Sequence, residues 1–241
     1  MSSPKRYQNG VTNVSSANTL SQYVALDPTK VVSYFNDFHT YAATDWVTTA
    51  VSIGAGTSAA AMSDTYVGGA IVITNAANES DGYQLQLSHD GGTNDSEIWR
   101  IQSGKKAWFK TKFQLNDADQ TEALVGLALA DTTLIASNPA DGVWFSSDDE
   151  TGTVDFKSSK NSAVSSVTGI GTLTDGTDAT MGFYWDGIDT YSIYFNDELA
   201  GTLQGGAIPD DEYLSISIAC LNGEATANAM AMDYIFAAME R

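Results

Sequence analysis

The stretch Ala179–Leu203, ATMGFYWDGIDTYSIYFNDELAGTL, decides the fold class. Its first part alternates in period two, with large apolar residues such as Met181 and Phe183 separated by smaller or polar ones. Alternation resumes after the turn sequence DGID and stops at Asn196-Asp197, a dipeptide suited to a two-residue hairpin turn. Aromatic and β-branched alternation between such turns predicts an antiparallel meander. We therefore expect three strands that form part of one face of a β-sandwich.

The composition fits many short strands around one sizeable core. The chain has 241 residues, of which 43% are hydrophobic and 10% aromatic, so it can bury a core in one large all-β domain or two small ones. Only 4 prolines accompany 21 glycines, which favours short strands joined by tight turns. We therefore expect an all-β antiparallel sandwich.

Segments with strand character recur along the whole chain from Val31, at the close spacing that a sandwich requires. Residues 123–130, ALVGLALA, are apolar on both faces and predict a central strand covered on both sides. Residues 97–104, EIWRIQSG, also predict a strand, whereas the Gly/Ala/Ser-rich residues 54–65 predict a loop. We expect no amphipathic helix and at most a single turn at 76–81 or 134–137.

The first thirty residues differ from the rest and predict an extended arm, so the chain divides into an arm (1–30) and a sandwich domain (31–241). The arm is polar, lacks periodicity and carries Lys5, Arg6 and Lys30 against the single acid Asp27. Two interpretations stay open: a disordered terminus, or an arm that becomes ordered against a partner. In the second case the anchors are its scattered apolar residues Tyr7, Val11, Val14, Leu20, Tyr23 and Leu26.

Charge and cysteine content exclude several classes of protein. The net charge of −19 argues against binding nucleic acid or an anionic membrane, since both require a basic surface. We find no signal-peptide pattern and no long apolar run, and we expect the chain to fold in a cytoplasm. The single cysteine, Cys220, is in phase with Ile216 and Ile218 and is expected as a small core residue rather than a nucleophile.

Some large sandwiches are glucanases, which carry a pair of catalytic carboxylates in the motif Glu-x-Asp-x-x-Glu on one strand. The nearest match, Glu79-Ser-Asp81-Gly-Tyr-Gln84, ends in an amide, and Asp81-Gly82 reads as a turn before a strand. No Gly-x-Ser-x-Gly elbow is present either. The sequence therefore predicts no catalytic residues and a protein that is not an enzyme.

The acids Asp148, Asp149 and Glu150 form one candidate for a cation site. They could bind Ca²⁺ through oxygen ligands, or they could be the solvated tip of a hairpin, which is the interpretation we favour. His39 and His89 lie far apart without a ligand partner at a suitable spacing. We expect no bound metal or cofactor.

One strand is basic in an otherwise acidic chain. The span from Arg100 to Lys112 holds five of the eleven basic residues, and the sequence KKAWFKTKFQL sets Lys and Trp on one face against Phe and Thr on the other. The favoured interpretation is an exposed face whose lysines discourage edge pairing. The alternative is a docking strip for an acidic partner or a second copy, formed by Arg100, Lys106, Trp108, Lys110 and Lys112.

Several stretches resemble the concanavalin/laminin-G-like jelly-roll proteins of tailed bacteriophages, notably marine ones. These stretches are DGVWFSSDDETGTVDF (141–156), the meander 179–203, the ending AMDYIFAAMER (231–241), and RYQNGVTNV (6–14) with DPTKVVSYFNDF (27–38). The resemblance covers nearly the whole chain. It implies a capsid decoration or cement protein that sits outside the icosahedral shell, commonly as a trimer. It carries over no catalytic residue, and the calcium site of carbohydrate-binding relatives has no counterpart.

The resemblance implies a structural virion protein on the outer capsid surface, made in the host cytoplasm, with the major capsid protein and its own copies as partners. The arm would anchor it to capsid subunits or neighbouring copies. The alternative is a carbohydrate-binding module for attachment to a host or surface, supported by the surplus of aromatic and loop Asn/Asp residues. A lyase or glucanase is a third, weaker alternative, and fold alone does not choose among the three.

Overall fold

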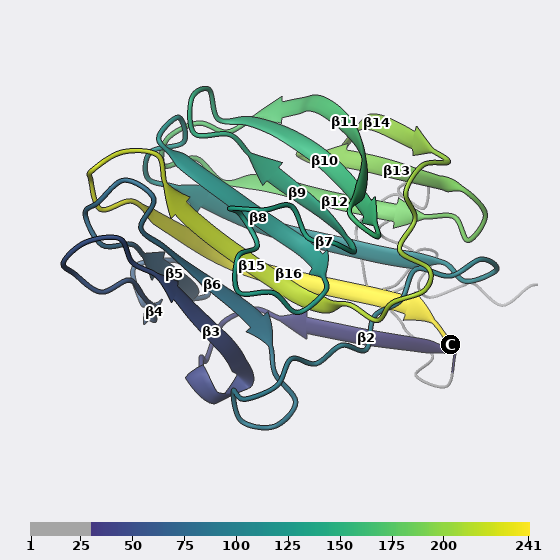
Figure 1. The fold of residues 1–241 in the computed structure, drawn as a ribbon, viewed down its shortest axis with the longest axis horizontal. Helices are drawn as coiled ribbons and strands as arrows, with labels where there is room; N and C mark the ends of the chain where they lie inside the picture. The colour runs from purple at the N-terminus through teal and green to yellow at the C-terminus, as the bar shows by residue number, and fades with distance from the viewer. Residues whose placement is uncertain (1–29) are drawn as a thin grey trace, which may run out of the picture.

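The alternating segments pair into two stacked antiparallel sheets in the computed structural model, which describes residues 30–241 (Figure 1). The predicted all-β sandwich is therefore confirmed. The arm predicted over residues 1–30 lies outside the described residues, apart from Lys30, and so do all of its proposed anchors.

One sheet has seven strands in the order β11-β10-β9-β8-β15-β6-β3. All of its neighbouring strands run antiparallel. Its strands are β3 (Trp46–Val51), β6 (Gly82–Leu87), β8 (Thr121–Ala128), β9 (Gly142–Ser147), β10 (Thr153–Lys160), β11 (Ala163–Thr172) and β15 (Ser215–Asn222).

The other sheet has eight strands, seven of them in the order β14-β13-β12-β7-β16-β5-β4. The long strand β16 pairs with β5 along its first part and with β2 along its second, so β2 completes this sheet. The strands are β2 (Val31–Asn36), β4 (Ala59–Ser63), β5 (Ala70–Thr74), β7 (Ala107–Leu115), β12 (Ala179–Trp185), β13 (Thr190–Phe195), β14 (Glu198–Gln204) and β16 (Ala229–Glu240).

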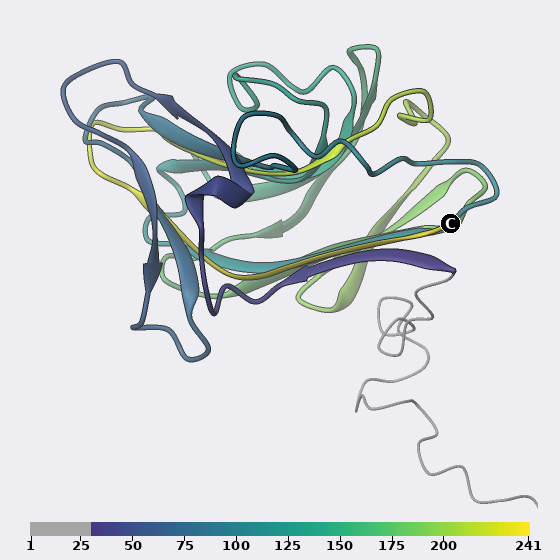
Figure 2. The same cartoon turned by 90° about the horizontal axis from the view of Figure 1, so that it is seen from below.

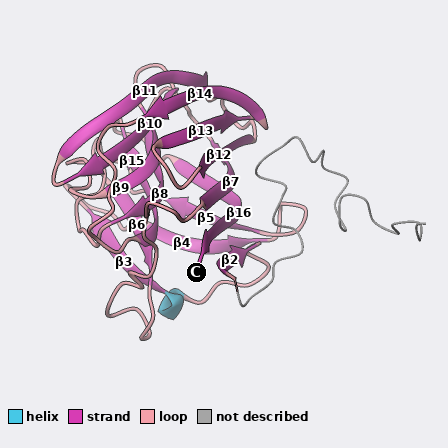
Figure 3. Cartoon of the chain, turned by 90° about the vertical axis from the view of Figure 1, so that its right-hand side faces the viewer, coloured by secondary structure: helices cyan, strands magenta, loops and turns pink. Residues whose placement is uncertain are grey.

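Helix is almost absent from residues 30–241. The described part holds one 3-10 helix, η2 (Ala43–Asp45), and is otherwise strand and loop (Figure 3). Residues 134–137 make a single turn, closed by the Ser137 N–H donating to the Thr133 carbonyl at 3.1 Å. No helix within the described residues has the length and apolar character to cross a membrane.

The meander predicted over residues 179–203 is confirmed as β12, β13 and β14. Asn196 and Asp197 adopt positive φ values of 49° and 65° at the β13–β14 turn. Such a pair of left-handed residues twists the chain in the sense that two antiparallel strands require. Asn161 and Ser162 adopt the same left-handed conformation, with φ values of 51° and 66°, at the turn between β10 and β11.

The core lies between the two sheets and is rich in aromatic rings. Phe183 of β12 stacks on Phe109 of β7 with ring centroids 5.6 Å apart, and it meets Phe156 of β10 edge-on at 5.8 Å. All five tryptophans are fully buried. Cys220 is a buried core residue, as expected, and burial raises the pKa of its thiol to about 12, which keeps it protonated and unreactive at neutral pH.

Strand β8 is covered on both faces, as the apolar pattern of residues 123–130 predicted. Val125 and Leu127 point into the main core between the sheets. Leu124 and Ala128 point the other way and pack under Leu134, which belongs to the β8–β9 connection. The second layer over β8 is therefore a loop, and that loop builds the site described below.

Two local predictions were wrong. Residues 97–104 are not a strand: Trp99 and Ile101 alternate because both are buried in the core, and Trp99 makes only an isolated bridge with Leu214. Residues 59–63, expected within a loop, form β4 on the sheet edge. Small alanines suffice there because the strand is held by backbone pairing to β5 rather than by large buried side chains.

Candidate functional site: a roofed pocket on the hollow face of the seven-stranded sheet

The backbone of the seven-stranded sheet curves towards its partner sheet, and we call the outer side of this curve the hollow face (Figure 2). The β8–β9 connection, residues 129–141, crosses this hollow in front of β8 and β15 (Figure 1). We call this connection the roof. Its residue Ile135 lines two pockets on this face.

Two glutamines of β6 fasten the roof to the sheet. Gln86 donates through Nε2 to the Leu129 carbonyl at 3.2 Å and accepts through Oε1 from the Asp131 N–H at 2.9 Å. Gln84 accepts from the Leu134 N–H at 3.2 Å and donates to the Asp131 carbonyl. Because both glutamines are buried, these bonds replace the water that the roof backbone would otherwise need.

Beside the roof, above β8, β9 and β10, lies a pocket of about 260 Å³. We call it the β8–β10 pocket. Strand register places Leu124, Ser146 and Asp155 in one row across the sheet, with Trp144 and Lys157 paired in the next. Its lining joins apolar, acidic and basic groups from sheet and roof: Glu122, Leu124, Leu134, Ile135, Asn138, Trp144, Ser146, Asp148, Asp155 and Lys157.

Trp144 is the aromatic residue of this pocket. Its partner across the strands is Gly126, where a Cβ would lie 2.5 Å from the Trp144 Cα, so only glycine lets the tryptophan lie this close to β8. The side chain is fully buried, yet its indole Nε1 has no hydrogen-bond acceptor within residues 30–241. The Nε1 of Trp99, in the core, lacks an acceptor in the described chain in the same way.

The pocket carries more negative than positive charge. Burial raises the pKa of the Glu122 carboxyl, and the charge of Asp149 adds to this, while Lys157 opposes it. Lys157 makes no ion pair with any acid in the described part of the chain. The Asp155 carboxylate accepts from the Gly169 N–H at 2.9 Å, which leaves further lone pairs for a ligand.

The acids Asp148, Asp149 and Glu150 lie at the β9–β10 turn, as the hairpin-tip interpretation predicted. Asp148 accepts from the Thr151 N–H at 2.7 Å and from the Glu150 N–H at 3.1 Å, so it stabilises the turn. His39 and His89 lie in separate loops; the first contacts Asp37 at 3.3 Å, and the second meets the Asp95 carbonyl at 2.9 Å.

A second acidic group, formed by Asp117, Asp119 and Asp175, has oxygens close enough together to hold a cation. Ligand atoms of Asp117, Asp119 and Asp175 lie within 4.8 Å of one another in the described structure. Burial raises the pKa of Asp117 to about 6, helped by Asp119 and Asp175. Sequence analysis missed this group because its members come from two loops nearly sixty residues apart, and nothing in either loop predicts their meeting.

The residues of the predicted docking strip do not form one row. Trp108, Lys110 and Lys112 share the outer face of the eight-stranded sheet, with Phe109 and Phe113 buried beneath, as expected. Strand β7 is central rather than at an edge, so its lysines have no edge to protect. Lys110 pairs with Asp197 at 2.6 Å, and Lys112 pairs with Asp178 at 2.8 Å and Asp233 at 2.9 Å. A docking role for this face stays a prediction.

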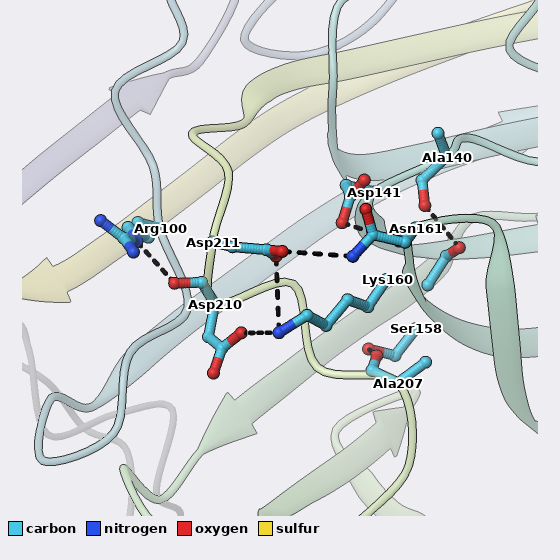
Figure 4. Close-up of polar contacts among 10 residues, drawn as sticks. Arg100, Ala140, Asp141, Ser158, Lys160, Asn161, Ala207, Asp210 and Asp211 are labelled. Carbon is cyan, nitrogen blue, oxygen red and sulfur yellow. Dashed lines mark hydrogen bonds and ion pairs between the residues drawn. The ribbon is translucent and has the colours of Figure 1, made fainter.

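Lys106 precedes β7, and Arg100 belongs to another cluster. Arg100 donates through Nε to the Asp210 carbonyl at 2.7 Å (Figure 4). Lys160 pairs with the Asp210 and Asp211 carboxylates, and Asn161 donates to Asp211 at 3.2 Å. These contacts tie the β14–β15 connection to the β10–β11 hairpin (Figure 4). The cluster is a brace between loops, and it lowers the pKa of Asp210 through Lys160.

The fold is that of the concanavalin-like lectins and glucanases. No protein-family model matches the sequence, and no curated protein matches it. Among solved structures, the carbohydrate recognition domain of Emp47p is similar with a TM-score of 0.56 and 11% identity, over 89% of this chain and 99% of that one.

Two further structures agree. A protein of unknown function from Shewanella oneidensis MR-1 has a TM-score of 0.55 at 13% identity, over 88% of this chain and 87% of its own. The endo-β-1,4-glucuronan lyase from the fungus Trichoderma reesei has a TM-score of 0.54 at 13% identity, over 85% and 94%. At such identities the likeness shows a shared fold and no more.

Proposed function

We propose that the protein binds carbohydrate in the β8–β10 pocket. The observation that carries the proposal is a lining that sets carboxylates, and a lysine that has no ion pair in the described chain, beside the apolar side chains of Leu124, Leu134 and Trp144. Sugars present hydroxyl groups that accept from such donors and donate to such carboxylates, together with C–H faces that pack on apolar side chains. The pocket offers all three kinds of contact in one place.

The comparisons support the same proposal at the level of fold. Two of the similar structures are, by their descriptions, a carbohydrate recognition domain and a glucuronan lyase. The likeness to these two structures favours the carbohydrate-binding alternative over the capsid-decoration role that the sequence resemblance implies. Because one fold hosts many activities, the weight of the proposal rests on the pocket rather than on these neighbours.

A panel of immobilised glycans, followed by calorimetry with the best ligand, tests the proposal. Lys157→Met should weaken binding at least about tenfold, because it removes the pocket's ammonium donor. Lys110→Met is the matched control, since Lys110 lies on the outer face of the other sheet and should leave affinity unchanged. Failure of every glycan to bind, or equal losses in the two variants, would overturn the proposal.

We propose further that the protein binds its glycan without cleaving it, as the missing acid motif predicts. Glycoside hydrolysis needs two carboxyl groups that flank the scissile bond. Here the strand motif Glu-x-Asp-x-x-Glu that supplies such a pair in sandwich glucanases is missing, and Asp148 is engaged in its own turn. Release of reducing ends or unsaturated products from the bound glycan would contradict this.

The virion role also stays a proposal, and it rests on the sequence resemblance to phage decoration proteins. A sugar-binding pocket and attachment to a capsid are compatible, because the arm predicted to anchor the protein is a separate segment. Quantitative mass spectrometry of purified particles tests it: a copy number near that of the major capsid protein is expected. Replacing the predicted anchors Val11, Val14 and Leu20 with Asp should then reduce particle association without changing sugar affinity.

A further inference from the structure

We infer that the β8–β10 pocket recognises a single sugar residue at the end of a glycan, and that this sugar is uncharged or carries an amine rather than a carboxylate. The inference rests on the proposed carbohydrate binding and specifies its ligand class. It follows from three features of the hollow face: the position of the roof, the size of the pocket and the charge of its lining.

The roof prevents a long chain from lying along the hollow. Ile135 of the roof lines the β8–β10 pocket on one side and a second pocket on the other. Leu134 beside it is fully buried against Leu124 and Trp144, so the roof is packed down on the sheet rather than held above it. A polysaccharide crossing the face would have to displace this packing and the bonds from Gln84 and Gln86.

The volumes of the two pockets agree with this. The β8–β10 pocket holds about 260 Å³, whereas sites for drug-sized ligands hold roughly 300–1,000 Å³. It therefore has room for one sugar ring and not for several. The second pocket holds about 60 Å³ and is lined mainly by apolar atoms from Val51, Gly82, Ile135, Ala219 and Leu221, so it offers no adjoining sugar subsite.

The charge of the lining selects against acidic sugars. Glu122, Asp148 and Asp155 stand against the single cation Lys157, and Asp149 is near enough to raise the pKa of Glu122. A ligand carboxylate or sulfate would meet like charges in a partly desolvated site, which is unfavourable. Sugar hydroxyls satisfy the same carboxylates, and an amine adds an attractive charge. The site thus differs in kind from one built for a polyuronate.

The nitrogen donor that the pocket offers to a ligand is the ammonium group of Lys157, because the indole Nε1 of Trp144 is buried and not accessible from the pocket. A ring hydroxyl can both accept from a nitrogen donor and donate to a carboxylate, which a carboxylate ligand cannot do. The lining is therefore matched to neutral hydroxyl groups.

Calorimetry on the full-length protein can test both parts of the inference. The probes are glucose, galactose and mannose, then, for the sugar that binds, its di- to tetrasaccharides, its 2-amino derivative and its uronic acid. We expect affinity to stay constant within about threefold from mono- to tetrasaccharide, and the uronic acid to bind at least about tenfold more weakly than the parent sugar. The amino sugar should bind at least as tightly as the parent.

The double variant Glu122→Gln/Asp155→Asn should narrow the gap between parent sugar and uronic acid to within about threefold, since it removes two of the repelling charges. Glu212→Gln, an exposed acid of the β14–β15 connection, is the matched control and should leave the gap unchanged. A circular dichroism spectrum like that of the wild type verifies that the double variant is folded.

The outcomes separate the inference from the proposed function. Affinity that rises more than about tenfold with chain length, or a uronic acid that binds as tightly as its parent sugar, would overturn the inference while leaving carbohydrate binding intact. Absence of binding by every mono- and oligosaccharide and by the glycan panel would overturn the proposed function and the inference together.

Discussion

The side-chain oxygen of Gln84, on β6, accepts a hydrogen bond from the backbone N–H of Leu134 in the roof at 3.2 Å. These two residues are 50 positions apart in sequence, and their contact joins the roof to β6. Leu134 then buries its side chain against Leu124 and Trp144. The hollow face is a pocket rather than an open groove because this contact exists.

Replacing Gln84 with Ala should loosen the roof while leaving the sandwich intact. The change leaves the buried Leu134 N–H and the Asp131 carbonyl without their partner, at a cost of about 1–3 kcal/mol. We expect faster amide hydrogen exchange over residues 129–141 and weaker sugar binding. Gln204→Ala, an exposed glutamine on β14, should change neither. Unaltered exchange in the roof would show that Leu134 packing alone holds it.

Trp144→Phe should weaken sugar binding as well as stability, whereas the same change at a tryptophan in the core should lower stability alone. Loss of part of the ring that lines the pocket is expected to weaken sugar binding at least about tenfold, with about 1–3 kcal/mol lost from the free energy of unfolding. Trp99→Phe is the matched control, because Trp99 is equally buried, also has an unpaired Nε1 in the described chain, and lies in the core away from the pocket. It should lower stability alone. Equal effects on binding would place the ligand elsewhere.

The sequence allowed the fold to be predicted because its strands bury one side and wet the other. Buried and half-buried residues alternate along β12 and β13 except at Gly182 and Phe195, and the Asn196-Asp197 turn joins β13 to β14. The same rule failed at Trp99, whose alternation with Ile101 reflects two core side chains on a loop. Periodicity reports burial, and burial usually but not always requires a strand.

The candidate site could not be predicted in the same way. Glu122, Trp144 and Asp155 belong to three strands, and only their register brings them together. One signal was available: residues 123–130 are apolar on both faces, which requires a cover over the outer face. A second signal is the length of the β8–β9 connection, which contains the apolar residues Leu134 and Ile135.

Lowering the pH should weaken the loop brace of Figure 4. Lys160 holds the pKa of Asp210 below its ordinary 3.8, so this ion pair stabilises the fold above about pH 4 and is lost as pH falls through the lowered pKa. Because Asp210 is half-exposed, Asp210→Asn should cost at most about 1 kcal/mol at pH 7. The free energies of unfolding of the two proteins in urea should converge as the pH falls through the lowered pKa of Asp210. In Glu212→Gln the stability at each pH should follow the wild type.

Asp117 should have the opposite pH dependence. Its pKa is raised to about 6 by burial and by Asp119 and Asp175, so the folded state takes up a proton more readily than the unfolded one. The stability that this provides is full below about pH 4 and is lost as pH rises through 6. Asp117→Asn should therefore be more stable than the wild type at pH 7, by about 1 kcal/mol after allowing for its partial exposure, and equal to it near pH 4. Asp64→Asn, a change of an exposed acid on another loop, should not reproduce this gain. Thermal unfolding from pH 4 to 8 measures both variants, and a loss of stability in Asp117→Asn at pH 7 would mean that the ionised carboxylate is held by favourable contacts that outweigh its repulsion from Asp119 and Asp175.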